Sequence, residues 1–405
     1  MVLGMFLLYS FSDDENANAP ELESESDNAP VAGSPRSGTV SGEAEKAEVE
    51  EQERALRIGV IGPETGKEAP YGLSVLKGVL AAAGRFNSRG GLHGSEIEVL
   101  HYDNRSDPEL TREGVQKFIR QRVIAILSAP TGWATFAPTH IANSTRTIFI
   151  SVGTRRRIGR SGPYVFRASL SDELATAELI RYAVKELAYT SFAMVTSSSY
   201  DYSLALSATF KRALVKHGGV LSIEADTYDT YSGKQDMDAV IDAISGSDST
   251  LHGVIFTGAL EEAVVLARGL REAGSNLPIL GGEDLFAAEY LNGGAAVRGT
   301  LLFATFSPDN ESPEAVEFKH DYGEGEPDRF SALAYDTFML LAQAIKTAGT
   351  TNTSKVREAL VSVKDFEGAT GKTSFTSSGT PVKQPFIYSV KEGEQGERFV
   401  LSKQQ

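Results

Sequence analysis

The stretch that decides the fold begins with the run LRIGVI at Leu56–Ile61, whose β-branched and apolar residues are typical of a buried strand. The segment Tyr71–Asn87 comes after a short turn. It carries apolar residues at helical spacing, namely Leu73, Val75, Leu76, Val79, Leu80 and Ala83. A buried strand followed by an amphipathic helix is the unit from which parallel sheets are built. We therefore expect an α/β protein.

The same alternation continues along the chain and predicts two lobes. In the first part we expect strands at 97–102, 123–127 and 147–152 and helices at 108–121 and 133–143. After Phe166-Arg167 we expect helices at 172–187, 204–217, 236–245 and 261–273 and strands at 191–196, 220–228, 253–257 and 278–281. Two such successions predict two mostly parallel sheets flanked by helices. A ligand site is expected in the cleft between them, at the carboxyl ends of the strands.

The length and composition are those of a globular protein with an acidic N-terminal tail. The 405 residues exceed what one core usually serves, and 41% are hydrophobic against 23% charged. Residues 1–54 hold 13 acidic and 3 basic side chains, so this segment accounts for −10 of the net charge of −15. Because it has few aliphatic residues, we expect a disordered tether. Met1–Phe11 is interpreted as part of an export signal, although it lacks a basic n-region, and the tail as a spacer or a solvated segment without a role.

Several classes of site are excluded by their missing motifs. Gly59-Val-Ile-Gly62 is not a G-x-G-x-x-G fingerprint, and Gly371-Lys372-Thr373 lacks the earlier glycine of a P-loop. No G-x-S-x-G elbow occurs, and the chain has no Cys. We expect no cofactor, no catalytic residue and no metal. No basic patch in the sequence points to nucleic acid.

Several segments, in their shared order and spacing, resemble one family. Phe86–Gly94 is similar to its aiNa-GGi-G turn, and Ile97–Asp103 with Asp107-Pro108 follows as in the family. Later agreements are Tyr164–Arg167, Ala334-Tyr335-Asp336, and Gly371–Phe375 with Gly379. The chain thus resembles the leucine/isoleucine/valine-binding class of periplasmic receptors, the type I solute-binding proteins of branched-chain amino acid ABC transporters. The likeness covers about residues 56–401.

The resemblance implies the type I periplasmic-binding-protein fold with three hinge crossings. Residues 56–168 and 300–378 would form lobe one, and residues 169–299 and 379–405 lobe two. It also implies a site in which lobe one fixes the α-carboxylate of an amino acid and lobe two its α-ammonium. The residues carried over to lobe one are Thr131, Gly132, Trp133, Gly153 and Thr154, and those carried over to lobe two are Tyr202 and Glu283.

Each of these residues also has an ordinary structural interpretation. Thr131 and Thr154 would then be helix caps, Trp133 a core residue, Tyr202 a packing residue and Glu283 a surface loop residue. Arg155-Arg156-Arg157, after the strand at 147–152, is either a solvated loop or a contact for an anionic ligand group.

The resemblance implies a periplasmic or extracytoplasmic receptor, tethered or free, that captures an amino acid or a similar small molecule. Its partners would be that ligand and the membrane permease of an ABC transporter. The alternative is a ligand-sensing regulator or a receptor ectodomain of the same fold, with an amide, urea or carboxylate ligand.

Overall fold

The computed structural model describes residues 56–403 except 93, 154–157, 198–200 and 230–233. The chain divides after Arg54 into two units, and every described residue belongs to the second. The expectations for Met1–Phe11 and for the acidic tail fall outside the described residues.

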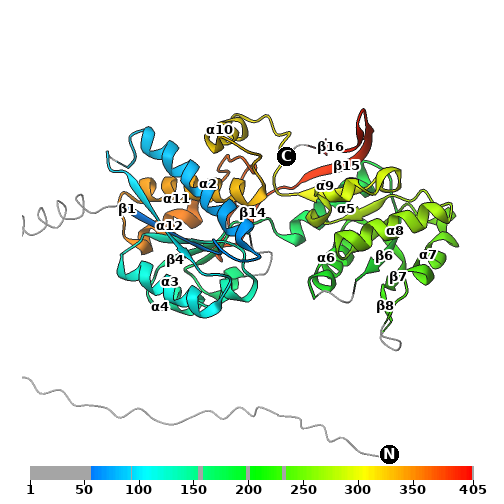
Figure 1. Cartoon of the computed structure of the whole chain (residues 1–405), viewed down its shortest axis with the longest axis horizontal. Helices are drawn as coiled ribbons and strands as arrows, with labels where there is room; N and C mark the ends of the chain where they lie inside the picture. The colour runs from blue at the N-terminus through cyan, green and yellow to red at the C-terminus, as the bar shows by residue number, and fades with distance from the viewer. Residues whose placement is uncertain (1–55, 93, 154–157, 198–200, 230–233, 404–405) are drawn as a thin grey trace, which may run out of the picture. The chain divides into compact units, whose positions relative to one another are not determined.

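Two sheets organise this unit (Figure 1). Five parallel strands form the first sheet, in the order β2 (Ile97–Asp103), β1 (Leu56–Gly62), β3 (Ala125–Ser128), β4 (Ile148–Ser151) and β5 (Val165–Arg167). Seven strands form the second, in the order β16 (Gly396–Lys403), β15 (Phe386–Gly393), β12 (Leu301–Ala304), β11 (Ile279–Gly281), β10 (Gly253–Thr257), β6 (Ser191–Thr196) and β7 (Val220–Asp226). Only β15 breaks the parallel arrangement of this sheet, because it runs antiparallel to both β12 and β16.

Among the described residues there are also two short antiparallel pairs of strands, β8 (Tyr228–Asp229) with β9 (Lys234–Gln235) and β13 (Ser374–Phe375) with β14 (Pro381–Val382). The α-helices are α2 (Ala69–Ser88), α3 (Pro108–Arg120), α4 (Thr139–Ser144), α5 (Asp172–Lys185), α6 (Asp201–His217), α7 (Met237–Ser245), α8 (Leu260–Glu272), α9 (Ala288–Leu291), α10 (Pro313–Tyr322), α11 (Arg329–Ala348) and α12 (Thr353–Ser362).

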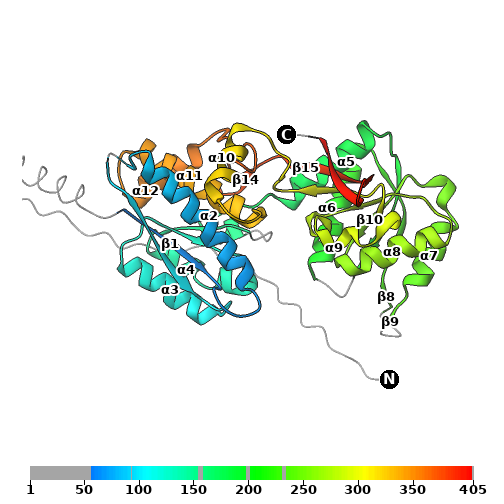
Figure 2. The ribbon, with the colours of Figure 1, turned by 45° about the horizontal axis from the view of Figure 1, so that its top comes forward.

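The first lobe is the five-stranded sheet with α2, α3, α4, α10, α11 and α12. Alternate residues of its strands point to opposite faces. Ile58 and Val60 of β1 belong to the core shared with α2 and α11, whereas Ile61 packs with α3 and α4. Helices α2 and α11 lie side by side over one face (Figures 1 and 2). Gly78 allows this approach, because a Cβ there would lie 2.2 Å from the carbonyl oxygen of Ser331.

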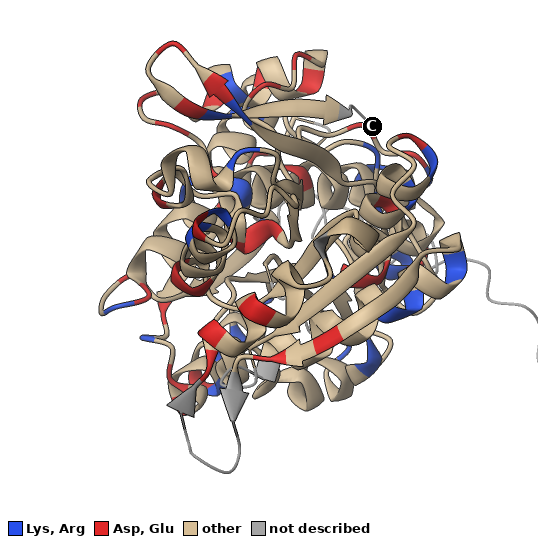
Figure 3. Cartoon of the chain, turned by 90° about the vertical axis from the view of Figure 1, so that its right-hand side faces the viewer, with Lys and Arg blue, Asp and Glu red and all other residues tan. Residues whose placement is uncertain are grey.

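The second lobe is the seven-stranded sheet with α5 to α9. Phe192 and Met194 of β6 pack against α5 and α6, and the intervening Ala193 and Val195 face the core shared with α7, α8 and α9. Residues of both charge signs are interspersed over its helices and strands (Figure 3). The expected fold class, two mostly parallel sheets flanked by helices, is confirmed.

The chain passes between the lobes three times. Ala168 belongs to a first-lobe core and Leu170 to a second-lobe core, so the first crossing lies at Ser169. Thr305 marks the second crossing, between Ala304 of the second lobe and Phe306 of the first. The third crossing lies between Phe375 and Phe386. The boundary expected at residue 300 therefore moves past Ala304, because β12 pairs with β11 and β15.

One expected helix is broken. Residues 133–143 were expected to form a continuous helix, but the chain forms a 3₁₀ turn, η1 (Gly132–Phe136), followed by the short helix α4. Pro138 lies between the two elements. It has no N–H to continue the hydrogen-bond ladder of a helix. The prediction of one helix here was wrong.

Candidate functional site

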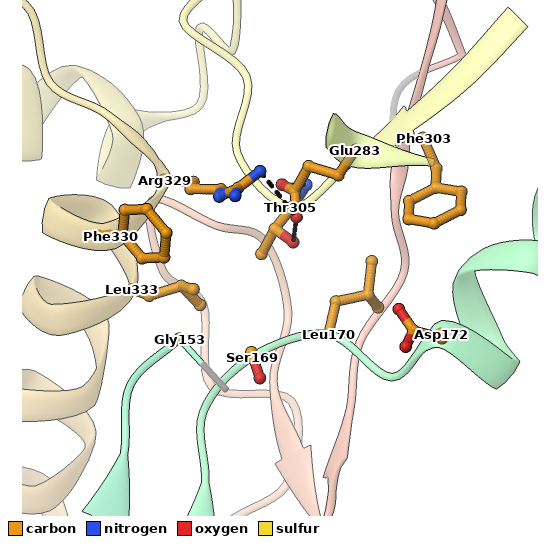
Figure 4. A pocket seen from close by; sticks show the side chains of 10 residues that line it. All are labelled: Gly153, Ser169, Leu170, Asp172, Glu283, Phe303, Thr305, Arg329, Phe330 and Leu333. Carbon is orange, nitrogen blue, oxygen red and sulfur yellow. Dashed lines mark hydrogen bonds and ion pairs between the residues drawn. The ribbon is translucent and has the colours of Figure 1, made fainter. Parts of the chain in front are cut away.

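Two neighbouring cavities receive side chains from both lobes. We call the first the Glu283 cavity. It is lined by Gly153, Phe330 and Arg329 of the first lobe, by Glu283 and Phe303 of the second, and by the crossing residues Ser169 and Thr305 (Figure 4). We call the second the Trp133 cavity, and it has a volume of about 520 Å³. Asp172 lines both, so the two cavities adjoin.

Glu283 reaches its cavity from the carboxyl end of β11. Gly281 ends the strand, Gly282 follows it, and Glu283 opens the short 3₁₀ turn η4 (Glu283–Leu285). The residue is only 6% exposed. Its Oε1 accepts a hydrogen bond from the backbone N–H of Thr305 at 2.6 Å, and its Oε2 accepts one from the Thr305 hydroxyl at 3.1 Å. The surface-loop interpretation of Glu283 therefore does not describe this residue.

Arg329 approaches the same carboxylate from the first lobe. It is the first residue of α11, after the N-cap Asp328, whose carboxylate accepts from the backbone N–H groups of Phe330 and Ser331. The guanidinium lies 3.7 Å from Oε2 of Glu283 and 3.7 Å from Oδ1 of Asp284 (Figure 4 draws the first of these contacts). The Glu283 cavity has a free volume of only about 10 Å³, which is roughly one water-sized sphere.

The Trp133 cavity has aromatic residues of η1 on one side and helix α6 on the other. Trp133 and Phe136 come from the first lobe, and their ring centroids are 5.9 Å apart. Trp133 is 71% exposed, which excludes the expectation of a core residue. From α6 come Tyr202, Ala205, Ala208, Thr209 and Arg212.

Tyr202 packs in the second lobe, as its structural interpretation expected, and it also lines the Trp133 cavity. Its ring is half buried and packs against the second-lobe core that contains Leu206 and Phe210. Its hydroxyl donates a 2.9 Å hydrogen bond to Oδ1 of Asp172, the first residue of α5. The contact fixes the carboxylate at the junction of the two cavities.

The sequence-predicted residues are only partly brought together. Gly153 and Glu283 line one cavity, and Trp133 and Tyr202 line the other. Thr131 is buried, and its N–H donates to the Thr135 hydroxyl at 3.0 Å, so this donor is used within its own loop. The neighbouring Gly132 has φ +55°, a left-handed conformation that glycine adopts without strain. Thr154 and Arg155-Arg156-Arg157 lie outside the described residues.

Sequence reasoning missed several cavity residues. Asp172 carried only the signal of a helix start. Thr305 and Arg329 lie in a stretch, 301–333, for which no strand or helix was expected. A four-residue apolar run such as LLFA at 301–304 gives a weak strand signal. No local pattern predicts that the first turn of α11 meets η4.

Comparison with known proteins agrees with this architecture. A family model described as periplasmic binding protein matches residues 55–396. The chain belongs to this family. Its members are solute-binding proteins and not enzymes, as expected from the sequence.

The similar proteins cover nearly the whole described chain. Leu/Ile/Val-binding protein homolog 2 of Brucella abortus is 24% identical over 350 residues, which are 84% of this chain and 92% of that protein. A putative branched-chain amino acid ABC transporter structure from Rhodospirillum rubrum is 26% identical, with a TM-score of 0.76 over 86% of this chain and 100% of that one. The substrate binding protein LivJ of Streptococcus pneumoniae, solved in complex with isoleucine, is 25% identical, with a TM-score of 0.65 over 86% of this chain and 100% of that one.

Two further findings concern the described part of this periplasmic binding protein. Among the described residues, no helix combines the length and the apolar character needed to cross a bilayer. Within the same residues, no group of three or more His, Asp or Glu side chains is placed to hold a metal ion.

Proposed function

We propose that this protein captures an amino acid or a closely similar molecule between its two lobes and delivers it to the permease of an ABC transporter. The observation that carries the proposal is the buried Glu283 carboxylate. It lies at the carboxyl end of β11, in a cavity that residues of both lobes line. Ligands of parallel sheets lie at this end of the strands. A carboxylate there is a partner for a ligand ammonium group.

The relatives support the ligand class. Leu/Ile/Val-binding proteins and an isoleucine complex are among the similar proteins. In our proposal the first-lobe segments at Thr131-Gly132 and at Gly153 face the carboxylate end of the ligand, and Glu283 faces its ammonium end. Because Arg329 now lies against Glu283 in a cavity of about 10 Å³, the ammonium can enter only if the guanidinium moves.

A thermal-shift screen of amino acids, amides and small carboxylates tests the ligand class. Ligand at 100 times Kd stabilises the folded state by about 2.7 kcal/mol, so a true ligand gives a clear rise in Tm. We expect at least one free amino acid to give such a rise. If only amides or urea derivatives raise Tm, the amino-acid assignment is wrong.

Delivery to a permease is tested in the host. Deleting the gene should abolish high-affinity uptake of the ligand found in the screen, and the intact gene supplied in trans should restore it. Unchanged uptake together with a lost transcriptional or behavioural response to the same ligand would support a sensing role instead.

A further inference from the structure

The Trp133 cavity has a feature that the proposed function does not use, an exposed indole opposite a strip of alanines. Trp133 is 71% exposed and lines a cavity of about 520 Å³. An aromatic ring that lines a cavity and remains in contact with water is stabilised when an apolar group of a ligand covers it. We infer that the ligand carries a neutral aromatic group, which Trp133 and the Ala205–Ala208 strip of α6 hold between the lobes.

The helix side of the cavity is shaped for a flat group. Tyr202, Ala205, Thr209 and Arg212 follow one another at spacings of three or four residues and so share one face of α6, and Ala208 lies beside them. The side chains of Ala205 and Ala208 end at Cβ, so the centre of this helix face projects less into the cavity than its two ends. The larger Tyr202 and Arg212 stand at its two ends. A planar ring can lie on such a surface.

The first-lobe side supplies the matching face. Trp133 and Phe136 are three residues apart on η1, with planes inclined by 52° and centroids 5.9 Å apart. Aromatic rings prefer offset-stacked or edge-to-face neighbours at such separations. Lobe closure over a ring would bury the indole. A ring the size of benzene needs about 150 Å³, which the cavity can supply.

The charges around the cavity favour a neutral group. Two basic residues line it, Arg167 and Arg212, and two acidic ones, Asp172 and Glu173. Arg212 lies 3.4 Å from Glu173 within the second lobe, and Asp172 accepts from the hydroxyl of Tyr202. Because the two signs balance, the lining does not select a charged side chain. Asp172 also lines the Glu283 cavity, so a ligand with its ammonium near Glu283 can extend its side chain towards Trp133. In this placement the inference rests on the proposed function.

The test uses the full chain, which contains one Trp, so the fluorescence of Trp133 can be followed without interference from a second indole in the protein. We would titrate phenylalanine, leucine, valine and 3-phenylpropionate, with calorimetry in parallel. Phenylalanine should bind at least tenfold more tightly than leucine or valine, and should shift or quench the Trp133 emission.

Two variants then separate aromatic recognition from general burial. Trp133→Leu keeps an apolar side chain but removes the ring. It should lower the affinity for phenylalanine about tenfold, while the affinity for leucine stays within threefold of the parent value. Ala208→Leu places a larger side chain at the centre of the α6 face, where the ring of the ligand would lie. It should also lower the affinity for phenylalanine more than the affinity for leucine. Tyr189→Phe, a change at an aromatic residue that lines neither cavity, is the matched control and should alter neither affinity.

The outcomes separate this inference from the proposed function. Leucine binding as tightly as phenylalanine, or a Trp133→Leu variant that weakens both equally, overturns the aromatic inference and leaves the proposed function standing. Binding of 3-phenylpropionate without any amino acid supports the aromatic inference and contradicts the ammonium site. Absence of binding by all four compounds overturns the aromatic inference, and the proposed function is then decided by the thermal-shift screen.

Discussion

Both oxygens of the Glu283 carboxylate are bound by one residue, Thr305, through its backbone N–H at 2.6 Å and its hydroxyl at 3.1 Å. Thr305 is the residue at which the chain leaves the second lobe for the first, between the core residues Ala304 and Phe306. The proposed ammonium partner is therefore also the residue that fixes one of the three crossings. A ligand that contacts Glu283 would therefore act directly on a segment that joins the two lobes.

Changing Glu283 to Gln separates these two roles. The amide keeps an acceptor for the Thr305 N–H and a group that can bond its hydroxyl, but it loses the negative charge. Loss of a charged partner costs roughly 2–5 kcal/mol, so the affinity for an ammonium-bearing ligand should fall about 30-fold or more. The Tm without ligand should change little. Calorimetric titration of parent and variant measures the first effect. If binding stays within threefold of the parent, Glu283 is not the ammonium partner and Asp284 becomes the candidate.

Glu283→Ala tests the structural role by itself. It removes the acceptor of a buried backbone N–H, because Thr305 is only 3% exposed. An unsatisfied buried donor costs about 1–3 kcal/mol. We expect Glu283→Ala to lower the free energy of unfolding by that amount, measured by urea denaturation, and Glu283→Gln to lower it much less. Equal losses in both variants would show that the charge and not the hydrogen bonds stabilises the crossing.

Arg329 should compete with the ligand for Glu283. Its guanidinium is 3.7 Å from Glu283 and 3.7 Å from Asp284, in a cavity that has little free volume. Arg329→Gln removes the competing charge, so an amino acid should bind several-fold more tightly. The des-amino analogue of the same ligand is the control, and its affinity should not rise. A fall in amino-acid affinity of tenfold or more would instead mean that Arg329 itself contacts the ligand.

Much of the fold could be predicted because most strands and helices are recognisable from the apolar pattern of their own residues. The strands at Ser191–Thr196 and Gly253–Thr257 have the expected bounds, since each is a short buried run. Helices α7 and α8 also lie within a residue of their expected bounds, because one face of each is apolar. Pro138 was visible in the sequence as well, and because proline has no N–H to continue the helical hydrogen bonds, a continuous helix through it should not have been expected.

The site was less accessible to sequence reasoning because it is made by contacts between distant segments. Glu283 and Thr305 are 22 residues apart, and Arg329 comes from the other lobe. The solvent exposure of Trp133 is a second property that the sequence could not predict. The sequence could not decide whether Trp133 is a core residue, since that depends on what lies opposite η1. Only the assembled lobes place an alanine strip there.

The N-terminal tail gives a simple prediction. Residues 1–54 carry no periodic apolar pattern. Removing residues 1–54 should leave the Tm and the ligand affinity of the remainder unchanged. Differential scanning calorimetry and titration of the two proteins check this. A loss of more than a few degrees would show that the tail packs on a lobe.

Two buried groups of opposite charge, joined through the Thr370 hydroxyl, lie beside the third crossing. Asp336 of α11 and Lys383, between β14 and β15, are 4% and 3% exposed. Asp336 accepts from the N–H groups of Ala369 and Thr370 at 2.7 and 2.8 Å, and the Thr370 hydroxyl connects it to the Lys383 ammonium. Lys383→Met should cost about 3–5 kcal/mol, because it leaves a buried carboxylate unpaired. Adding Asp336→Asn should recover a large part of that loss.

The same pair predicts how stability depends on pH. Burial lowers the pKa of Lys383 from 10.5 to about 8, against the opposing attraction of Asp336. Burial also raises the pKa of Asp336, so the two groups titrate as a pair. Between pH 8 and 10.5 the unfolded chain holds the lysine proton while the folded pair has lost it. Stability therefore rises with pH across this window.

The contribution of the pair is the difference in unfolding free energy between the parent and the Asp336→Asn/Lys383→Met double variant, measured by urea denaturation at several pH values. The unfolding free energy of the parent should increase relative to that of the double variant between pH 8 and 10.5. A difference that stays constant would mean that Lys383 keeps its ordinary pKa in the folded protein.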